Sequence, residues 1–565
     1  MGEKSKKGGQ QEQGNKKNTP NVKVVFLGGV GEIGKNMTAI ECGDNIIVID
    51  AGSCFPNQEE MPGIDYIIPD FNYLQQNAKR VKGIIVTHGH EDHIGAIPYV
   101  LKEVNTPVYG SNLAIALIQH KITEHKLEGI KLKVVEEREV VTLGCFSVEF
   151  VRVTHSIAGA FAVAVTTPKG VIFHTGDFKI DHTPVDGRCV DFSRIAQIGE
   201  NGVLLLLQES TNVEIDGYSM SERNVGKSLD NIFGQNIHKR LIVATFASNV
   251  HRIQQILNCA LKYNRRVAFS GRSMENIVKI TYAIKELKYP PNLLIDLDKI
   301  GSIPNDRVCI LATGSQGEPE SALSRMSTNE FKKVVIGKDD TVIIAASPIP
   351  GNQRSIYKVI NNLSRKGADV IYHALTSIHV SGHACREELK MMMSLTKPKF
   401  FMPVHGEYRH LKLHAELASL MGISPANVEI PELGQVYDIS KSGIKKQGTV
   451  PSGIVMLDSS LQESSEVLLR DRKLMSGDGF VIAIVNASSK SGELTAPPII
   501  ISRGIMLPES LVEDIKTELS VKFMANAGSE FVASEARNDI RKVCAKILFN
   551  KLKRRPMVIP ITIES

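Results

Sequence analysis

The sequence predicts a multidomain α/β protein, and three observations lead to this prediction. First, the chain has 565 residues, enough for about three domains of roughly 100–200 residues each. Second, its first part consists of short apolar segments separated by turn residues, and helical and strand patterns alternate from about residue 221 onward. Third, a further α/β unit follows a stretch rich in Gly, Ser and Lys at 443–453, which we interpret as a linker.

The first part of the chain is expected to be rich in strands, with one helix at 94–104. The expected strands here are 22–27, 37–41, 46–49, 81–87, 148–154, 161–166, 171–175 and 203–208. From residue 221 the alternation of helices and strands predicts a parallel sheet flanked by helices. The expected helices are 223–236, 250–262 and 274–285, and the expected strands are 240–245, 266–270, 308–312, 341–346, 369–372 and 399–403.

Composition limits the kinds of protein that this chain can be. No apolar run approaches the roughly 18 residues that span a bilayer, and the N-terminus has no apolar stretch of a secretory signal. The eight cysteines are scattered and form no C-x-x-C pair, which excludes a zinc ribbon and argues against a disulfide framework. We therefore expect a cytoplasmic protein without a membrane partner.

The net charge does not by itself identify a nucleic-acid-binding protein. The formal net charge is +6, and half of it lies in residues 1–20, which carry five lysines against two glutamates. Because these residues are poor in apolar side chains, we expect a disordered basic tail, with weak contact to a nucleic acid as the alternative role. The rest of the chain is nearly balanced, so any site for a polyanion must come from local clusters.

A glycine-rich motif near the N-terminus is similar to a dinucleotide-binding loop. Gly29, Gly31 and Gly34 match G-x-G-x-x-G directly after a strand, and Asp50 ends a later strand at a suitable distance for a ribose. In such a loop a helix should follow the glycines and bind pyrophosphate at its N-terminus. Residues 36–49 instead predict two short strands around a tight turn, so we interpret the motif as a Gly-rich turn.

Four potential metal ligands lie within six residues, directly after the apolar strand 83–86. They are His88, His90, Asp92 and His93. Imidazole is a preferred ligand of Zn²⁺, and a carboxylate suits zinc or harder cations. Alternate residues of an extended segment share a face, so His88 and His90 can bind one ion while Asp92 and His93 face a neighbouring ion. A single histidine is usually structural, but four such residues in this array predict a metal centre.

Two ions need ligands beyond these four, and three other strand ends offer them. His155, Asp177 and His405 each lie at the end of an expected strand. The carboxylate of Asp177 could bridge two cations, as in two-metal hydrolytic sites. Each of these residues, taken alone, is equally well explained by a structural role. Together with 88–93 they predict a metal-dependent hydrolase.

The order of these motifs is similar to that of the metallo-β-lactamase superfamily. The resemblance consists of H-x-H-x-D-H at 88–93, a strand-end His, T-G-D at 175–177 and a distant His, while Asp50 resembles a carboxylate that supports the metal loops. Longer strings resemble the ribonuclease J family of β-CASP ribonucleases over nearly all of residues 22–565. These strings are Glu209–Asn212, Ala244–Arg252, Ala312–Pro319, Ser347–Asn352, His379–His383, Pro403–Arg409 and Arg554–Met557.

This resemblance implies a domain order for the whole chain. A metallo-β-lactamase αββα sandwich would be built from residues 21–220 and 376–447, with a β-CASP α/β domain inserted at 221–375. A linker at 448–464 would lead to a C-terminal α/β domain at 465–565, which the resemblance associates with dimers or tetramers.

The resemblance also implies two Zn²⁺ ions per subunit, with Mn²⁺ or Mg²⁺ in their place or in addition. Three histidines would hold the first ion. One aspartate and two histidines would hold the second, and a further aspartate would bridge the two ions. These ligands are His88, His90 and His155, then Asp92, His93 and His405, and the bridging Asp177. Some paralogues have lost part of this cluster, whereas this chain keeps all of it, which implies an active enzyme.

The resemblance implies catalytic roles for His383 and Glu209, and also for the metal ligand Asp92. His383 resembles the family's catalytic histidine, which would donate a proton or a hydrogen bond to oxygens of the transition state, and Glu209 would orient it. Glu209 is a departure, because many relatives carry Asp there. The alternative for His383 is a structural role.

Contacts with RNA are implied by two groups of residues. Ser347, Ser381 and Gly382 resemble a pocket for a 5′-monophosphate, because short hydroxyls and a bare backbone N–H approach phosphate closely. The further candidates are His379 and Val380 beside the pocket, and Ser248, Asn249, His251, Arg252 and Arg272 in the inserted domain. The alternatives are a structural His379 and, at 248–252, a helix cap with a solvated Arg.

The function implied by the resemblance is hydrolysis of RNA, 5′-to-3′ from monophosphorylated ends and also internally, in mRNA decay and in maturation of ribosomal RNA 5′ ends. Implied partners are RNA, further copies of the chain, a paralogue and an RNA-degrading complex. Three alternatives remain: a small-molecule metallo-hydrolase, which has no need of the 221–375 insertion, a non-catalytic scaffold, and a DNA-directed nuclease. Because the chain has few aromatic residues and no Trp, little base stacking and slight sequence preference are expected.

Overall fold

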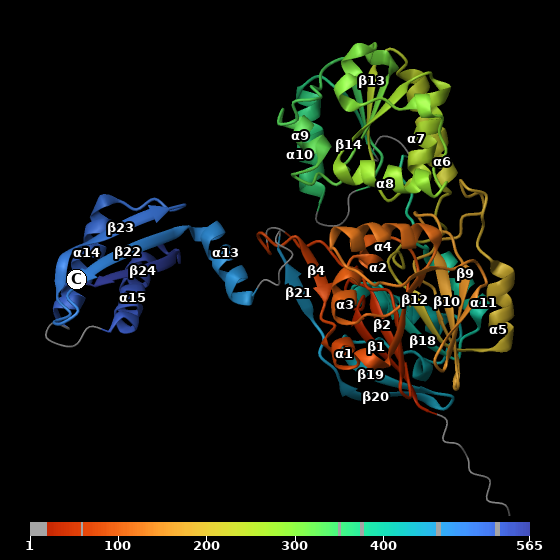
Figure 1. Ribbon diagram of the computed structural model, residues 1–565, viewed down its shortest axis with the longest axis horizontal. Coiled ribbons are helices and arrows are strands. Elements are labelled where there is room, and N and C mark those ends of the chain that lie inside the picture. Colours follow the sequence, from red (N-terminus) through yellow and green to blue (C-terminus); the bar gives the residue numbers. More distant parts are fainter. Residues whose placement is uncertain are drawn as a thin grey trace, which may run out of the picture. The chain divides into compact units, whose positions relative to one another are not determined.

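The protein divides into two compact units, each with its own core. The computed structural model describes residues 20–57, 60–347, 352–372, 378–458, 465–525 and 532–564. The first unit comprises Met1–Cys54 and Ile68–Ile454, and the second comprises Phe55–Ile67 and Val455–Ser565. The elements of each unit are labelled in Figure 1. The basic tail expected at 1–20 lies, except for Pro20, outside the described residues.

The larger sheet of the first unit has eight strands in the order β20–β19–β1–β2–β3–β5–β6–β7. Its strands from β3 to β7 are parallel, and those from β20 to β3 are antiparallel. The bounds are β1 Val22–Gly28, β2 Met37–Cys42, β3 Asn45–Ile49, β5 Val81–Ile85, β6 Val108–Gly110, β7 Leu132–Val134, β19 Gln435–Ser440 and β20 Gly443–Thr449.

The second sheet of this unit has six strands in the order β18–β12–β11–β10–β9–β8. β18, β12 and β11 are parallel, so their carboxyl ends lie at the same edge. The remaining pairs are antiparallel. The bounds are β8 Val140–Leu143, β9 Phe146–Arg152, β10 Phe161–Thr167, β11 Gly170–His174, β12 Val203–Glu209 and β18 Phe400–Val404.

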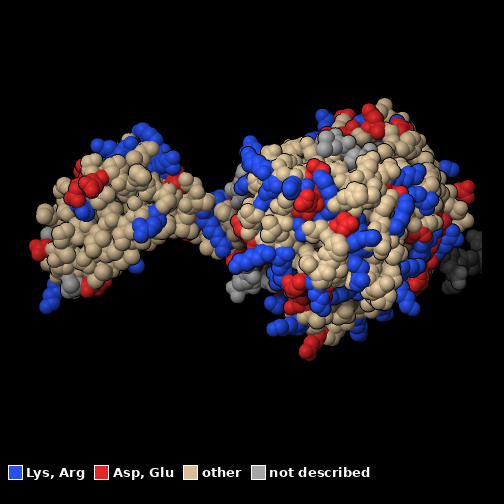
Figure 2. Space-filling model, turned by 90° about the horizontal axis from the view of Figure 1, so that it is seen from above, with Lys and Arg blue, Asp and Glu red and all other residues tan. Residues whose placement is uncertain are grey.

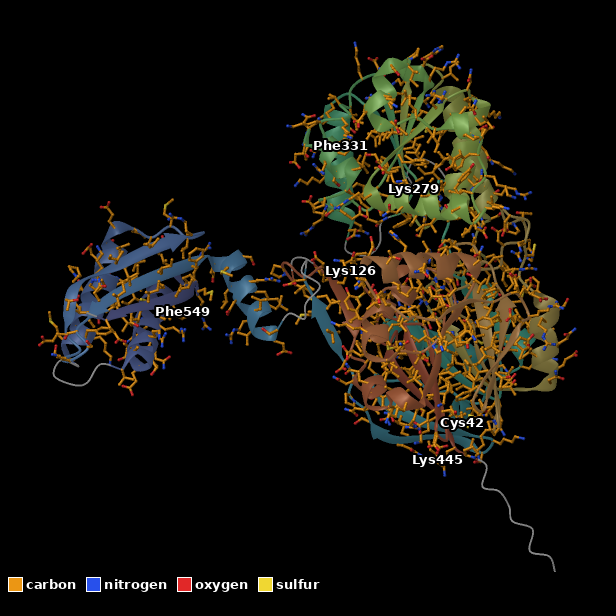
Figure 3. The ribbon with its side chains drawn as sticks, in the orientation of Figure 1. Cys42, Lys126, Lys279, Phe331, Lys445 and Phe549 are labelled. Carbon is orange, nitrogen blue, oxygen red and sulfur yellow. The ribbon has the colours of Figure 1, made fainter. Side chains whose placement is uncertain are left out.

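The main core lies between these two sheets, because alternate residues of each strand point to the facing sheet. Phe26 of β1, Phe150 of β9 and Val163 of β10 are among its fully buried members. Side chains from the two sheets fill the space between them, and Cys42, labelled in Figure 3, belongs to this core.

Helices cover the outer faces, which makes this unit the αββα sandwich of the predicted fold class. A second cluster packs α5, α11 and α12 on the six-stranded sheet, and α1 to α4 lie beside the eight-stranded sheet (Figure 1). The bounds are α1 Asn72–Gln76, α2 Glu91–Ile94, α3 Ile97–Glu103, α4 Asn112–Glu124, α5 Phe192–Asn201, α11 Arg386–Thr396 and α12 Tyr408–Leu420.

An inserted domain with a fully parallel sheet separates β12 from α11 in the chain. Its strand order is β14–β15–β13–β16–β17, as the alternation of helices and strands predicts. The strands are β13 Arg240–Ala244, β14 Arg266–Ser270, β15 Val308–Ala312, β16 Asp340–Ile344 and β17 Asp369–Tyr372. The helices are α6 Glu222–Gln235, α7 Val250–Lys262, α8 Arg272–Ala283, α9 Ala322–Ser327 and α10 Gln353–Arg365.

The second unit contains the C-terminal α/β domain, a three-stranded sheet with two helices packed on one face. The sheet order is β23–β22–β24, and apolar residues of α14 and α15 form a core with β22. The bounds are α13 Glu466–Asp478, β22 Phe480–Ala487, β23 Leu494–Arg503, α14 Glu509–Ala525, α15 Ala533–Leu552 and β24 Met557–Glu564. The remaining strands, β4 Tyr66–Pro69 and β21 Ile454–Leu457, pair with each other.

One expectation about local structure was wrong, and the bounds of one helix differ from those expected. The stretch 443–453 is not a linker, because β20 occupies Gly443–Thr449 and pairs with β19. β20 lies at the edge of the sheet, where its polar side chains are exposed and lysines are common. An edge strand of this kind has the same composition as a linker, which explains the error. The helix expected at 94–104 is present as α3, which begins at Ile97 and ends at Glu103. The short helix α2 before it was not expected, and the two are separated where the Ala96 amide donates to the Ala51 carbonyl over 2.8 Å.

The interpretation of the Gly-rich motif as a turn is confirmed. The glycines of the G-x-G-x-x-G motif are followed by the β2–β3 hairpin and not by a helix, so the motif is a turn. Gly29, Gly31 and Gly34 all have positive φ, a conformation that favours glycine. All eight cysteines are free thiols. Among the described residues, no helix combines the length and the apolar character needed to cross a bilayer.

Candidate metal centre

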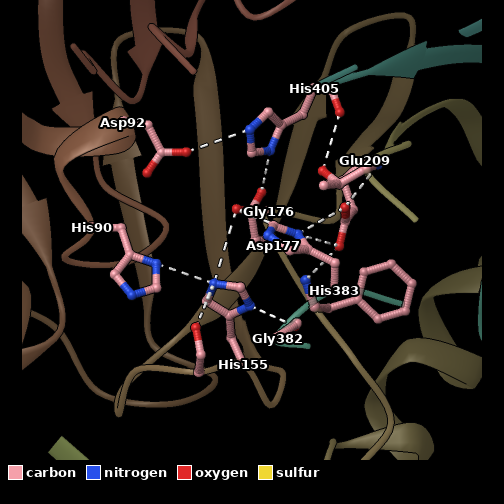
Figure 4. Close-up of polar contacts among 12 residues, drawn as sticks. His90, Asp92, His155, Gly176, Asp177, Glu209, Gly382, His383 and His405 are labelled. Carbon is pink, nitrogen blue, oxygen red and sulfur yellow. Dashed lines mark hydrogen bonds and ion pairs between the residues drawn. The ribbon is translucent and has the colours of Figure 1, made fainter. Parts of the chain in front are cut away.

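Strand ends of both sheets converge at one edge of the sandwich and bring the predicted ligands together (Figure 4). The segment 88–93 follows β5 of the larger sheet. The other residues lie at or just beyond the carboxyl ends of strands in the smaller sheet, three of which are parallel neighbours. These residues are His155 after β9, Asp177 after β11, Glu209 at the end of β12 and His405 after β18.

The first group of possible ligands consists of His88, His90 and His155. The Nδ1 atom of His90 lies 3.1 Å from the Nε2 atom of His88 and 3.1 Å from the Nε2 atom of His155. Burial lowers the pKa of His90 to about 4 and holds the pKa values of His88 and His155 well below 6.5. The three imidazoles are therefore neutral, and their lone pairs can be directed at one cation.

The second group consists of Asp92, His93, Asp177 and His405. Asp177 Oδ1 lies 2.8 Å from His405 Nδ1, and Asp177 Oδ2 lies 3.1 Å from His93 Nε2. Burial lowers the pKa of His405, but the carboxylates of Asp177 and Asp92 outweigh it and raise the pKa to about 10. Among the described residues, His405 Nε2 is buried without a hydrogen-bond partner, 3.4 Å from Asp92 Oδ2. A cation that replaces the Nε2 proton of His405 would fit between this nitrogen and the carboxylates around it.

Asp177 faces both groups. Its Oδ2 atom is 3.8 Å from His88 Nε2 and 4.0 Å from His155 Nε2, in addition to its contact with His93. The side chain is almost fully buried, and the cationic forms of His405 and His93 lower its pKa against the opposing effect of burial. The ionised carboxylate is therefore positioned between the two sets of imidazoles.

Hydrogen bonds fix which nitrogen of three histidines points at these groups. His93 Nδ1 donates to Asp50 Oδ2 over 2.7 Å, and His155 Nδ1 donates to the Gly382 carbonyl over 2.7 Å. Thr87 donates its hydroxyl proton to Asp50 and accepts from His88 Nδ1 over 3.0 Å. In each case the Nε2 atom is left for a cation. Asp50 therefore supports the site without belonging to either group.

Two residues of the site have a strained backbone. Asp50 has φ of 60° and His405 has φ of 51°, both in the left-handed region that non-glycine residues rarely adopt. The His405 amide donates to the Gly29 carbonyl over 2.6 Å, which ties it to the Gly-rich turn. Such strain persists where the surrounding structure enforces it, and it is typical of functional sites.

His383 lies beside the second group and is held by Glu209. Its Nδ1 atom donates to Glu209 Oε2 over 3.1 Å and is 3.8 Å from Asp177 Oδ2. Glu209 is buried, and its carboxylate also accepts backbone N–H groups of Phe178 and Thr211. Because Nδ1 is engaged, Nε2 is the nitrogen of His383 that can face a ligand.

The residues expected around a phosphate occupy different environments. The Ser381 hydroxyl accepts from Asn212 Nδ2 over 2.7 Å and from the His383 amide over 3.2 Å, so its own proton is left to donate. Gly382 approaches the metal groups closely, since a Cβ there would lie 2.8 Å from His155 Cε1. Val380 is buried, and the Ser347 carbonyl accepts from Gln316.

In the inserted domain, the structure favours structural roles for two of the expected RNA contacts. Asn249 is buried and caps α7, accepting from the Arg252 amide over 3.0 Å. The Arg252 guanidinium is fully buried and pairs with Glu222. Ser248 is half-buried and Arg272 is exposed at the start of α8. His251 lines, together with His155, a hollow in the surface.

Three residues that contact the site had not been singled out from the sequence. Thr87 connects Asp50 to His88, and Asn36 donates to the Asp92 carbonyl over 3.1 Å. Asn212 holds Ser381 and the His383 carbonyl. Single Thr and Asn residues are common in loops, so residue type gave no signal. For Thr87 the position directly before His88 was the available clue.

Family models match four consecutive parts of the chain. The metallo-beta-lactamase superfamily matches residues 30–209, and the ribonuclease J beta-CASP domain matches 238–363. A Zn-dependent metallo-hydrolase RNA specificity domain matches 367–431, and the ribonuclease J C-terminal domain matches 467–565. A solved structure of a protein of unknown function from Enterococcus faecalis V583 shares the fold, with a TM-score of 0.53 and 16% identity over 74% of this chain and all of that one.

Relatives of known name are similar over nearly the whole length. Ribonuclease J of Synechocystis sp. is 42% identical, covering 96% of this chain and 86% of the relative. Ribonuclease J of Thermus thermophilus is 39% identical, covering 96% of this chain and 95% of the relative. Ribonuclease J2 of Bacillus subtilis is 38% identical, covering 97% of this chain and 100% of the relative. The sandwich, the inserted parallel sheet, the clustered His and Asp residues and these matches lead to one conclusion: the chain belongs to the ribonuclease J family.

Proposed function

We propose that this chain is a two-metal ribonuclease that hydrolyses RNA phosphodiesters. One observation carries the proposal: two groups of largely buried ligands face the carboxylate of Asp177. Zn²⁺ suits a site made mainly of imidazoles, with Mn²⁺ or Mg²⁺ as substitutes. The first ion would be held by His88, His90 and His155, and the second by Asp92, His93 and His405.

The chemistry divides between the cations and the side chains. Two bound cations would make water more acidic and offset the charge that grows on the phosphoryl oxygens. Asp177 would keep the two ligand groups at a fixed separation. Asp50 and Thr87 would hold the imidazoles in the required orientation. His383, oriented by Glu209, would donate a proton or a hydrogen bond through Nε2 to a phosphate oxygen or to the leaving oxygen.

A pocket for the RNA 5′-monophosphate would set the direction of cleavage. The free hydroxyl proton of Ser381 supports such a pocket, and Ser347, His379 and the backbone of 380–382 would complete it. A 5′ end held at a fixed distance from the cations would release nucleotides stepwise in the 5′-to-3′ direction. RNA that enters at an internal position would be cut endonucleolytically. Ser248 and Arg272 remain proposed backbone contacts, whereas Asn249, which is buried and caps α7, is proposed to be structural.

The charge distribution fits a substrate that is bound in a local site. Figure 2 shows Lys and Arg side chains distributed together with Asp and Glu over the visible face, rather than gathered in one block. RNA recognition would therefore depend on the hollow beside His155 and His251 and not on a general basic surface. We propose cytoplasmic roles in mRNA decay and in ribosomal RNA 5′-end maturation, alongside a paralogue and an RNA-degrading complex, and the eight free thiols fit a reducing compartment.

The C-terminal domain supports self-association. Ile482 and Ile484 of β22 pair with Ile499 and Ile501 of β23 on the sheet face opposite α14 and α15, and Ile561 of β24 continues this face. Ile499 is 49% exposed and Ile561 38% exposed. Contiguous apolar surface of this kind marks an interaction site, so we propose a homodimer or tetramer. Light scattering on Ile499→Asp should give a smaller particle than the wild type, and an unchanged mass would contradict this.

The function is tested with one RNA prepared with a 5′-monophosphate, a 5′-hydroxyl or a 5′-triphosphate, in buffer with zinc or manganese. We expect mononucleotides from the monophosphorylated RNA, slower release from the other two, and none after chelation. Matched DNA tests the DNA-directed alternative. A chain that turned over lactam or thioester substrates but left all three RNAs intact would be a small-molecule hydrolase. Complementation of a deletion strain by His90→Ala would indicate a scaffold.

A further inference from the structure

Arg252 is fully buried at the start of α7, in a place where its charge cannot reach RNA. Its guanidinium donates from Nε and Nη2 to the two carboxylate oxygens of Glu222, each over 2.9 Å. Its Nη1 donates to the Ala345 carbonyl over 2.7 Å and contacts His379 Nδ1 at 3.2 Å. A buried arginine with this many directional contacts holds its neighbours in one arrangement.

The partners of Arg252 come from three segments that matter for the proposed pocket. Glu222 begins α6, where the chain enters the inserted domain. Ala345 lies two residues before Ser347, and His379 lies two residues before Ser381 on the segment that returns to the sandwich. One side chain therefore ties the entry of the inserted domain to both sides of the proposed phosphate pocket.

The same network continues to the metal centre. The Glu222 amide donates to Asp181 Oδ2 over 3.0 Å, and Lys179 Nζ donates to the Met220 carbonyl over 3.0 Å. Lys179 and Asp181 are buried and follow Asp177 by two and four residues. Thr154, directly before His155, donates its hydroxyl proton to the Lys179 carbonyl over 2.7 Å. Buried polar contacts thus connect the metal loops, through the segment that enters the inserted domain at Glu222, to Arg252.

We propose that the Arg252–Glu222 pair is a positioning element that sets the distance between the 5′-phosphate pocket and the metal centre. The inference rests on the proposed function. It adds a residue pair that determines which RNA 5′ end the enzyme accepts and which phosphodiester bond it cleaves first. Removing the pair would leave the metal groups intact, because neither residue contacts a proposed ligand through the contacts described. It would displace the segments that carry Ser347 and Ser381.

The chain offers a variant and a matched control. Loss of one partner leaves an unpaired buried charge, whereas replacing both partners by apolar residues of similar size often preserves folding, so the variant is Glu222→Met with Arg252→Met. Arg252→Lys, which keeps the charge but loses the fork, is the second variant. The control is Arg240→Met with Asp340→Met. Arg240 makes a similar bidentate pair in the same inserted domain, with bonds of 2.7 and 2.9 Å to Asp340, and it also donates to the Val335 carbonyl.

The measurement follows the length of the first product and the rate ratio between 5′-monophosphate and 5′-hydroxyl RNA, with bound zinc counted in parallel. A misplacement of about 1 Å can cost about 100-fold in a positioned reaction, so we expect the ratio to fall about 10- to 100-fold in both Arg252 variants. First products should become heterogeneous in length, while zinc content and internal cleavage stay close to wild type. The control should keep the wild-type ratio.

Three results would overturn the proposal. The first is a wild-type ratio and uniform first products in either folded Arg252 variant. The second is an equal loss in the Arg240 control, which would indicate a general effect on the domain. The third is failure of both Arg252 variants to fold, since the pair would then be required for folding and not for positioning. A wild-type enzyme that shows no preference for the 5′-monophosphate would instead disprove the proposed function, and this inference with it.

Discussion

The metal edge of the sandwich and the strand ends of the inserted domain both collect polar residues at the carboxyl ends of parallel strands, but the two edges use them differently. At the metal edge, His88, His90 and His155 direct neutral nitrogens at one another and leave a place for a cation. At the inserted edge, Arg252 and Asn249 are satisfied by Glu222 and by the start of α7.

The difference shows how a ligand site can be separated from a structural polar cluster. Buried polar groups are normally hydrogen-bonded within the protein, so several acceptor nitrogens that face one another, as in His88, His90 and His155, require another explanation. A bidentate Arg–Glu pair requires none. Substitutions at the two edges should therefore differ in kind, with loss of metal and chemistry at one and loss of stability or position at the other.

The largest effect is expected for Asp177→Ala. This change removes the carboxylate that faces both ligand groups, and loss of two-metal charge stabilisation worth several kcal/mol corresponds to at least about a 1000-fold loss of RNA cleavage. Bound metal, counted by mass spectrometry, should fall below the wild-type content. The control is Asp44→Ala, which removes an exposed carboxylate in the β2–β3 turn. Unchanged metal content together with unchanged cleavage would mean that Asp177 is not a ligand.

A smaller loss is expected for His383→Gln, about 100-fold or more, because this residue would act as an acid or hydrogen-bond donor and not as a ligand. Glutamine keeps a donor near Glu209 but cannot transfer a proton. Single-turnover rates at saturating RNA should fall while the number of bound metal ions stays at the wild-type value. A loss of metal equal to that of Asp177→Ala would instead assign His383 to the metal groups.

The double change Ser347→Ala with Ser381→Ala distinguishes binding of the 5′-phosphate from binding of the metal ions. Since these hydroxyls would bind a phosphate and not a metal, exonuclease action on 5′-monophosphorylated RNA should fall about 100-fold, about tenfold for each lost hydrogen bond to a charged group. Internal cleavage of a circular RNA, which has no 5′ end, serves as the control reaction. Equal losses on linear and circular RNA would place the 5′-phosphate elsewhere.

The smallest effects are expected for Asn249 and Arg272 in the inserted domain. Asn249→Ala should lower the free energy of unfolding by about 1 kcal/mol through loss of the α7 cap, with RNA affinity unchanged. Arg272→Ala should leave stability unchanged and reduce the salt dependence of RNA binding by about one phosphate contact. Chemical denaturation measures the free energy of unfolding, and filter binding at several salt concentrations measures the affinity for RNA and its salt dependence. The reverse pattern would restore Asn249 as the RNA contact.

Much of the fold follows from patterns that the sequence displays directly. Apolar strand patterns and turns place β1, β2 and β3, and alternation places the parallel inserted sheet, because these features depend on local periodicity. β20 was missed because an exposed edge strand needs no apolar pattern, only a partner for its backbone. The short helix α2 and its separation from α3 were missed because the Ala96 amide donates to Ala51, a contact that only the fold creates.

The candidate site was predictable where residue type carries the chemistry, and less so where position does. The 88–93 cluster indicates a metal by composition alone, and His155, Asp177 and His405 joined it through their places at strand ends and through family resemblance. Burial decides the role of Arg252, and no sequence pattern distinguishes a solvated arginine from a buried one. Thr87 and Asn36 matter through single hydrogen bonds that only the fold creates.

The most direct measurement is anomalous diffraction at the zinc edge from crystals of the zinc-loaded protein. Two peaks about 3.5–4 Å apart should appear, one in contact with His88, His90 and His155 and the other with Asp92, His93 and His405, both touching Asp177. A single peak, or peaks remote from these residues, would contradict a two-metal centre built on Asp177.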